Sequence, residues 1–390
     1  MHFGLSDDQA QFVARVREFA RTRVAPRAAG IDQTGTYPRD LITEAAGLGL
    51  TGLTIGAELG GAGRDYVSAA AALEEVASAS ATVAVILVVH NSLVAEPLAE
   101  FGTPEQKAQW LGRLARGEAL GSFALSEAQS GSDAAHQKTT AVADPSTSLG
   151  AGGGWRLSGE KVWVTSGAVA DVTLVFAATR PGEGSHGITC FLVPMSAPGV
   201  TISASPEALG VHGLGCVTLT LEDVRVGREH VLGQVDGGFA LARRALEGGR
   251  VAIAAQAIGV GRAALEEALA FAKTREAFGH PISVFQAIQF QLADLATDLE
   301  AARMLTWKAA DARDRLPHAT VEAAMAKLMA SEAAHRAADR ALQILASEGY
   351  RKGSTIERLF RDIRAAEIYQ GTSEIQRMII ARAIVGTHDS

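Results

Sequence analysis

The spacing of apolar residues changes twice along this chain, and that change limits the folds open to it. Over about residues 6–117, apolar residues recur at the three- and four-residue intervals of amphipathic helices. Over about 120–231, the sequence consists of short β-branched runs separated by Gly, Pro and Asp, which is typical of strands and turns. From residue 237 to the end, helical spacing returns in long Ala- and Leu-rich runs. The pattern predicts an α+β protein with a helical, a β and a second helical region.

The length of the chain sets the number of units. With 390 residues it can bury a substantial core and is expected to form two or three packed units. We place them at residues 1–118 (helical), 119–234 (β) and 235–390 (helical). The low-complexity stretch 145–154 (PSTSLGAGGG) falls between two strand candidates and is expected to be a flexible hairpin tip.

Composition excludes several classes of protein. Charged residues make up 20% of the chain and the net charge is −7, without the basic patch that a nucleic-acid-binding protein shows. Cys190 and Cys216 stand apart in apolar segments, which indicates buried free thiols rather than a metal or redox pair. The N-terminus lacks an apolar leader core, and the longest apolar run, 81–89, is too short to span a bilayer. These features predict a cytoplasmic protein that binds neither a membrane nor nucleic acid.

The sequence argues against three common kinds of site. Gly47, Gly49 and Gly52 match G-x-G-x-x-G, but a helical segment precedes them and a Gly-rich loop follows, whereas a dinucleotide site needs a strand and then a helix. The ten histidines are scattered and form no metal-binding motif. No G-x-S-x-G sequence occurs, so an acyl-transfer triad has no starting point.

Four stretches carry groups suited to chemistry. Residues 123–133 (FALSEAQSGSD) offer hydroxyls and exposed backbone where helix gives way to strand. In 161–167 (KVWVTSG), an expected strand, Trp163 and Thr165 would share one face and could cover a planar ring and bond to its edge. Residues 274–282 (TREAFGHPI) join two helices, and 367–377 (EIYQGTSEIQR) predict a helix, a tight polar turn and another helix.

Together and in this order, these stretches resemble the acyl-CoA dehydrogenase family over nearly the whole chain. The loop LGLTGLTIGAELGGAG is similar to a loop of that family, and FQAIQFQLADLATDLEAARMLTW is most similar to its short-chain, butyryl-CoA branch. The resemblance implies an N-terminal α-helical domain, a middle β-barrel or sandwich domain and a C-terminal four-helix bundle. It also implies a homotetramer built as a dimer of dimers.

The resemblance further implies FAD as cofactor, held between the β domain and the C-terminal helices, with one site shared by two subunits. The residues that match the family's FAD contacts are Phe123, Leu125, Ser126, Gly131, Ser132, Trp163, Thr165, Thr372 and Glu374 on one subunit and Arg275, Phe278, Gln286 and Gln343 on its neighbour. The positions that match substrate contacts are Ser132, Glu247, Arg250, Tyr369 and Gly371. No metal is implied.

The family's reaction is α,β-dehydrogenation of an acyl-CoA, after which an electron-transfer flavoprotein takes the electrons. A glutamate removes the α-proton, while the flavin ribityl hydroxyl and the backbone N–H of the same glutamate bind the thioester oxygen. In this chain that position is Gln370, whose amide accepts no proton at neutral pH. A minority of the family has the glutamate before the arginine that matches Arg250, and here that residue is Gly249.

Other departures from the family pattern are Ala128, His212 and the pair Ala346-Ser347. Several explanations of Gln370 stay open: a deliberately made Glu-to-Gln variant, a different base with Glu247 as first and Glu348 as second candidate, or proton removal from another position of the acyl group. The same fold also carries flavin monooxygenases and subunits that bind without turnover. The short-chain match and the mostly intact FAD residues favour a dehydrogenase.

Overall fold

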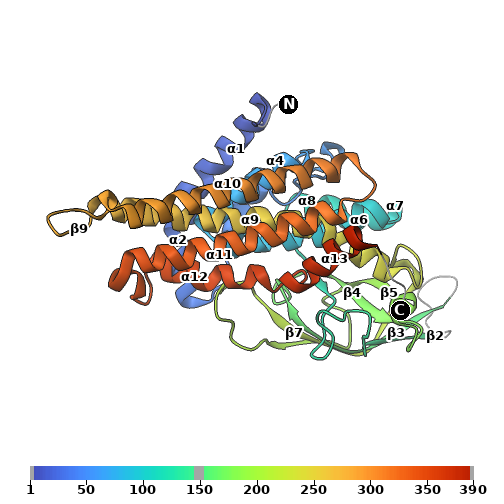
Figure 1. Cartoon of the computed structure of the whole chain (residues 1–390). Helices are drawn as coiled ribbons and strands as arrows, with labels where there is room; N and C mark the ends of the chain where they lie inside the picture. Colours follow the sequence, from blue (N-terminus) through green and yellow to red (C-terminus); the bar gives the residue numbers. More distant parts are fainter. Residues whose placement is uncertain (1–3, 145–152, 387–390) are drawn as a thin grey trace.

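A computed structural model of the chain describes residues 4–144 and 153–386. Helices from the two ends of the chain pack side by side, and the β region covers one end of this helical body (Figure 1). The predicted α–β–α order and the α+β fold class are therefore confirmed. Of the proposed hairpin tip at 145–154, residues 145–152 lie outside the described residues, but the strands that flank them pair, with Asp144 opposite Gly154.

The N-terminal region is helical up to Ala115. Its elements are α1 (Asp7–Phe19), η1 (Ala20–Val24), α2 (Ala25–Thr34), α3 (Arg39–Ala46), η2 (Ala57–Leu59), α4 (Tyr66–Ala79), α5 (Ala81–Val88), η3 (Val89–Ala95), α6 (Glu96–Phe101), α7 (Pro104–Gln106), η4 (Lys107–Leu111) and α8 (Gly112–Ala115). Ser6 caps α1 in the expected capping box with Gln9. The Gly47–Gly52 sequence follows α3 in a turn, so it has no strand before it.

A single continuous helix, formed by α5, η3 and α6, runs from Ala81 to Phe101. It is longer than the apolar run at 81–89 and, by length and composition, it could cross a membrane. However, 94% of its most apolar window is buried inside the protein. It is therefore the core helix of the N-terminal region.

The β region forms an eight-stranded sheet. Its strands are β1 (Gly121–Ala124), β2 (Thr140–Asp144), β3 (Gly154–Val164), β4 (Val172–Ala178), β5 (Ile188–Pro194), β6 (Val200–Ala204), β7 (Val217–Gly227) and β8 (Val231–Leu232). The order is β6-β7-β3-β2-β4-β5-β8, with β1 parallel to β4. Leu174 and Phe176 of β4 pack in the core shared with the helices, whereas Val175 packs in a separate core on the other face. Successive side chains of β4 thus point into two different cores, and the face with Leu174 and Phe176 joins the sheet to the helical body.

One expected strand is shorter than predicted. β3 ends at Val164 rather than continuing to Gly167, and its pairing with β7 is irregular between Lys161 and Val164. Trp163 has a φ of 56° and Ser166 a φ of 61°, both in the left-handed region. The strict alternation assumed for Trp163 and Thr165 therefore does not apply, because a bulge turns the chain at this point.

The C-terminal region consists of long helices. They are α9 (Gly238–Thr274), α10 (Gln286–Arg315), α11 (Thr320–Tyr350), α12 (Thr355–Arg364), η8 (Ala365–Glu367) and α13 (Ser373–Val385). Between α9 and α10 lies a two-stranded hairpin, β9 (Glu276–Ala277) and β10 (His280–Pro281), followed by η7 (Ile282–Val284). The hairpin was not predicted, and its turn has left-handed φ values at Phe278 (55°) and Gly279 (81°).

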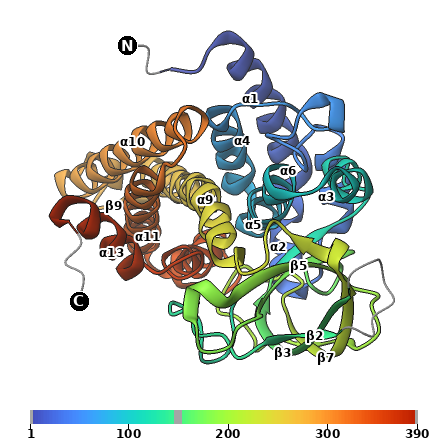
Figure 2. The same cartoon turned by 90° about the vertical axis from the view of Figure 1, so that its right-hand side faces the viewer.

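Helix α9 lies at the centre of the helical body, between α4, α5, α10 and α11 (Figure 2). Small residues allow this close packing. Alanines recur at three- and four-residue intervals along α11, from Ala323 to Ala341, and are fully buried. Gly259 is needed on α9, since a Cβ there would lie 2.3 Å from the Glu74 carbonyl oxygen of α4.

The backbone of α11 is distorted at Ala346, which has φ 52° and ψ −127° inside the helix. This conformation favours glycine, because the Cβ of any other residue is crowded there. We therefore expect Ala346→Gly to raise the free energy of unfolding by about 1 kcal/mol. Urea denaturation tests this, with Ala341→Gly as the matched control. At that buried helical position the same change should destabilise the protein by about 1 kcal/mol, and equal losses in both variants would contradict the expectation.

Candidate active site

The turn between η8 and α13 holds Gln370 at its tip, as the sequence predicted for a helix, polar turn and helix. Gln370 has a φ of 53° and Gly371 a φ of 95°, so two consecutive residues are left-handed. Thr372 caps α13 by accepting a hydrogen bond from the Ile375 N–H at 3.4 Å. The Gln370 N–H has no acceptor among the residues that the structure describes. It is free to bind an oxygen of a ligand.

The two positions where the family can carry its base converge on one point. A Cβ built on Gly249 of α9 would lie 2.1 Å from Gln370 Oε1 and 3.0 Å from Leu93 Cδ2. Gln370 Oε1 is itself buried and has no hydrogen-bond partner in the described structure. A side chain at either position would therefore reach the same spot, and in this chain neither position supplies a carboxylate.

Buried polar groups surround this spot. Arg250 follows Gly249 on α9, and burial lowers the pKa of its guanidinium to about 10. Tyr369 precedes Gln370 and donates its hydroxyl to Gln256 Oε1 at 2.9 Å. Burial raises the Tyr369 pKa far above its usual value, so the hydroxyl keeps its proton. Arg250 thus places a buried positive charge on the helical side of this spot.

A small apolar cluster lies next to Gln370. It combines residues of the core helix, of α9, of the β region and of the turn that carries Gln370. Its members are Val85, Val89, Leu93 and Ala245, packed with Phe123, Leu214, Leu246 and Tyr369. Leu93 is the residue that a side chain at 249 would touch, so the cluster adjoins the polar spot. An apolar group placed between Gln370 and this cluster would be shielded from water.

Glu247, our first alternative for the base, is occupied elsewhere. Its carboxylate accepts hydrogen bonds from Arg244 at 2.7 Å, from the Ala319 N–H at 3.0 Å and from the Thr320 hydroxyl at 2.6 Å. These contacts join α9 to the start of α11. The geometry gives Glu247 a structural role, because these three donors hold its carboxylate at the junction of α9 and α11.

We therefore expect Glu247→Gln to lower the free energy of unfolding by about 1–3 kcal/mol, since a buried hydrogen-bonded charge is lost. The rate of flavin reduction by a bound acyl-CoA should change less than about threefold. Urea denaturation and single-turnover kinetics on the same preparation test both statements. A stable variant in which flavin reduction is lost would indicate that Glu247 acts as the base after all.

Glu348, the second alternative, lies in the last turns of α11, about 30 Å along that helix from the level of Lys327, which contacts the Gln370–Gly371 turn. Its side chain is exposed and pairs with Arg351 at 3.5 Å. Within one chain it cannot reach Gln370.

A buried ion pair anchors the loop at 123–133. Lys161 Nζ donates to Glu127 Oε1 at 2.8 Å and to the Leu125 carbonyl at 3.1 Å. Glu127 also accepts the N–H groups of Lys138 and Thr139 at 2.7 and 3.0 Å. Burial alone would raise the Glu127 pKa, but the Lys161 charge lowers it to about 2. Glu127 is therefore ionised and fixes the backbone beside Phe123, Leu125 and Ser126.

Several of the predicted FAD-contact residues on the β region stay accessible. Trp163 exposes 50% of its surface although it is a large apolar side chain, and Thr165 beside it is half-buried. Phe123 and Ser126 are also half-buried, whereas Gly131 and Ser132 are exposed. An exposed indole on a rigid strand end fits a planar ring that would cover it. Leu125 is buried and contributes backbone rather than side chain.

The predicted FAD contacts from the neighbouring subunit lie at the far end of the helical body. Arg275 and Phe278 belong to the hairpin at β9, which Figure 1 places away from the sheet. Gly249 and Arg275 are about 40 Å apart along α9. Phe278 is 94% exposed, and the Arg275 side chain has no partner among the described residues. Gln286 begins α10 and Gln343 is exposed near the end of α11, so one chain does not bring this set to Trp163.

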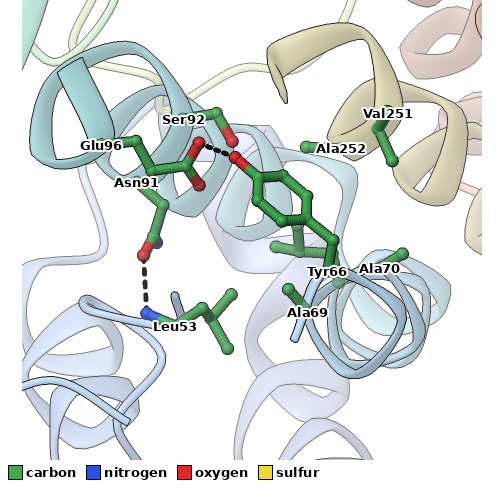
Figure 3. Close-up of a pocket in the computed structure, with 10 residues that line it drawn as sticks. Leu53, Tyr66, Ala69, Ala70, Asn91, Ser92, Glu96, Val251 and Ala252 are labelled. Carbon is green, nitrogen blue, oxygen red and sulfur yellow. Dashed lines mark hydrogen bonds between the residues drawn. The ribbon is translucent and has the colours of Figure 1, made fainter. Parts of the chain in front are cut away.

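A second polar cluster lies where α4, the core helix and α9 meet (Figure 3). The Tyr66 and Thr54 hydroxyls donate to the Glu96 carboxyl, and burial raises the Glu96 pKa. A Cβ on Gly248 would lie 2.9 Å from Glu96 Oε2. The adjacent glycines of α9 thus face two different groups, Glu96 and Gln370. Sequence reasoning did not single out Glu96, since an isolated glutamate gives no signal of burial.

The departure at His212 also has a structural account. Its Nδ1 lies 3.0 Å from the Asp32 carbonyl oxygen and its Nε2 lies 2.9 Å from the Ala208 carbonyl oxygen. Burial opposes protonation, but these acceptors raise its pKa. His212 therefore joins the β region to α2. Over residues 4–144 and 153–386, no group of His, Cys, Asp or Glu side chains could hold a metal ion.

Comparison with known proteins agrees with the fold. Three family models match: the acyl-CoA dehydrogenase N-terminal domain at residues 6–118, the middle domain at 122–224 and the C-terminal domain at 236–385. The mitochondrial short-chain specific acyl-CoA dehydrogenase of Bos taurus is 43% identical over 96% of this chain and 89% of its own length.

Two solved structures extend the comparison. Butyryl-CoA dehydrogenase from Megasphaera elsdenii superimposes with a TM-score of 0.94 at 38% identity, covering 99% of this chain and 100% of that one. A structure described under electron transferring flavoprotein of Acidaminococcus fermentans and flavin-based electron bifurcation also has a TM-score of 0.94, at 36% identity, covering 99% and 100%.

The fold and the site define a flavin-dependent oxidoreductase. The chain belongs to the acyl-CoA dehydrogenase family, and its cofactor is FAD.

Proposed function

We propose that this protein catalyses α,β-dehydrogenation of a short-chain acyl-CoA and passes the electrons to an electron-transfer flavoprotein. We further propose that Gln370 occupies the position of the proton acceptor. The main support is that a Cβ built on Gly249 would lie 2.1 Å from Gln370 Oε1. Both positions where the family can carry its base therefore meet at one spot, and in this chain neither supplies a carboxylate.

The residues around this spot suit the binding half of the reaction. The free N–H of Gln370 would donate to the thioester oxygen and polarise the carbonyl group. The apolar cluster at Leu93 would take the short acyl chain and exclude water from the α-carbon. Similarity to short-chain and butyryl-CoA enzymes supports a short acyl group. The similarity to the structure described under electron transferring flavoprotein supports the choice of electron acceptor.

FAD, when bound, supplies the hydride acceptor. The residues present fit its two ends: Trp163 and Thr165 would cover and bond to the flavin ring, with Phe123, Leu125 and Ser126 on its other edge. Thr372 and Glu374, at the start of α13, would also contact FAD on the same subunit. The unpaired guanidinium of Arg275 suits a phosphate group, but it lies too far from Trp163 in one chain. We therefore propose that the Arg275, Phe278, Gln286 and Gln343 set serves a neighbouring subunit, in at least a dimer and, by family likeness, a tetramer.

The protein is expected to carry FAD when isolated. Extensive dialysis followed by an absorbance spectrum measures this, and apoprotein should regain the flavin spectrum when FAD is added. Arg275→Gln should lower FAD affinity by roughly 10-fold or more, because one charge-assisted hydrogen bond is lost. The exposed Arg340 of α11, changed to Gln, is the control. A folded, colourless protein that takes up no FAD would contradict the proposed function.

A further inference from the structure

The carbonyl oxygen of Gly371 is held from two sides. Lys327 Nζ of α11 and Gln376 Nε2 of α13 both donate to this oxygen at 2.8 Å. Both side chains are completely buried. Gln376 Nε2 also lies 3.4 Å from the Gln370 carbonyl oxygen, so the two donors together hold the tip of the turn.

Lys327 is unusual because it is a buried ammonium without a carboxylate of its own. It forms no ion pair within the described part of the chain. Glu367 is paired with His335 and Arg364, and Glu332 with Arg377. Burying a lysine without a carboxylate partner costs free energy. We therefore expect its hydrogen bond to stabilise a neighbouring group.

The turn that it contacts is such a neighbour. Gln370 is a non-glycine residue with a left-handed φ of 53°, and Gly371 follows at 95°. Each left-handed non-glycine residue is disfavoured and persists only when its surroundings fix it. If the turn relaxed, the N–H of Gln370 and its side chain would no longer point to the same ligand.

We propose that Lys327 is a positioning residue, which with Gln376 holds the Gln370–Gly371 turn so that the Gln370 N–H binds the thioester oxygen. The inference deepens the proposed function and rests on it for the identity of the ligand. The geometry of the turn in the free protein can be tested separately.

The contact should also depend on pH. Burial and the nearby Arg250 charge lower the Lys327 pKa to about 7, against the attraction of Glu367, Glu332 and Glu374. The ammonium, which is the stronger donor, therefore predominates below about pH 7, and the neutral amine above it. The hold on Gly371 should weaken as pH rises through this value.

Lys327→Met removes the donor and keeps most of the volume. Ser331→Ala, one turn further on α11, is the control, because Ser331 is equally buried but donates only to Leu328 of its own helix. In the free protein we expect the amides of Ile375 and Gln376, whose hydrogen bonds end on Thr372, to exchange roughly 10-fold faster in Lys327→Met and unchanged in Ser331→Ala.

The second readout is the infrared band of butyryl-CoA labelled with ¹³C at the thioester carbonyl and bound to the FAD-containing protein. Its shift to lower frequency reports the hydrogen bonds to the thioester oxygen, including that of the Gln370 N–H, and at least half of the shift should be lost in Lys327→Met. In the unmodified protein the shift should decrease between pH 6 and pH 8.5. If Lys327→Met does not fold, Gln376→Leu and this pH series carry the same test.

A folded Lys327→Met protein with control-like exchange and an unchanged carbonyl shift would overturn the inference. So would a shift that is independent of pH in the unmodified protein together with an unaffected Gln376→Leu. If butyryl-CoA does not bind at all, the proposed function fails, while faster exchange in Lys327→Met would still show that Lys327 holds the turn.

Discussion

Gln370→Glu should increase the rate at which a bound short acyl-CoA reduces the flavin by roughly 10²- to 10⁴-fold, the usual contribution of a positioned general base. The introduced carboxylate would lie where Gln370 Oε1 now lies, buried and without a partner. The two side chains are nearly isosteric, so little repacking should accompany the change. Single-turnover reduction under anaerobic conditions measures the effect.

The charges around the turn support this expectation. Burial and the Arg250 charge lower the pKa of the Lys327 ammonium, and burial lowers the pKa of the Arg250 guanidinium, while Gln370 beside them is neutral. A carboxylate at position 370 would offset both, so Gln370→Glu should also raise the Lys327 pKa above about 7. If Gln370→Glu adds nothing to a rate that is already fast, the base lies elsewhere. Glu96→Gln and Glu247→Gln would then show whether either buried acid takes part.

A carboxylate on α9 should restore the reaction as well. In Gly249→Glu combined with Gln370→Gly, the new side chain projects toward the space that Gln370 Oε1 leaves, since a Cβ at 249 would lie 2.1 Å from that atom. Glycine at position 370 accepts the φ of 53° without strain. We expect reduction roughly 10²-fold faster than in the matched pair Gly249→Gln with Gln370→Gly.

The matched pair separates the carboxylate from the altered packing, because the two double variants differ only in one proton-accepting group. Gly249→Glu alone should be less active, since its Cβ meets both Gln370 and Leu93. Equal rates in the two double variants would show that position 249 does not point at the acyl group.

The sequence predicted much of this architecture because apolar spacing is a local property. The change of period at about residues 117–120 and again at 237 matches the end of α8 and the start of α9. The turn that carries Gln370 was also recognisable from the sequence, since Gln370, Gly371 and Thr372 are consecutive. The bulge at Trp163 and the hairpin at Phe278 were missed, because left-handed residues other than glycine leave no mark in the hydrophobic pattern.

Contacts between distant segments could not be predicted. Lys327 stands in an Ala-rich helix, and its sequence does not distinguish a buried lysine from a solvated one. Only the packing of α11 against the turn shows its contact with Gly371. For the same reason Glu247 looked available as a base, whereas the start of α11 in fact occupies its carboxylate.

The most direct test of the account uses the unmodified protein. A short acyl-CoA such as butyryl-CoA is mixed anaerobically with the FAD-loaded protein, and the flavin spectrum is followed from milliseconds to hours. We predict an immediate spectral perturbation from binding, followed by reduction that is slower by roughly 10²-fold or more than in Gln370→Glu. Complete reduction of the unmodified protein at the rate of Gln370→Glu would contradict the claim that the proton acceptor is missing from this site.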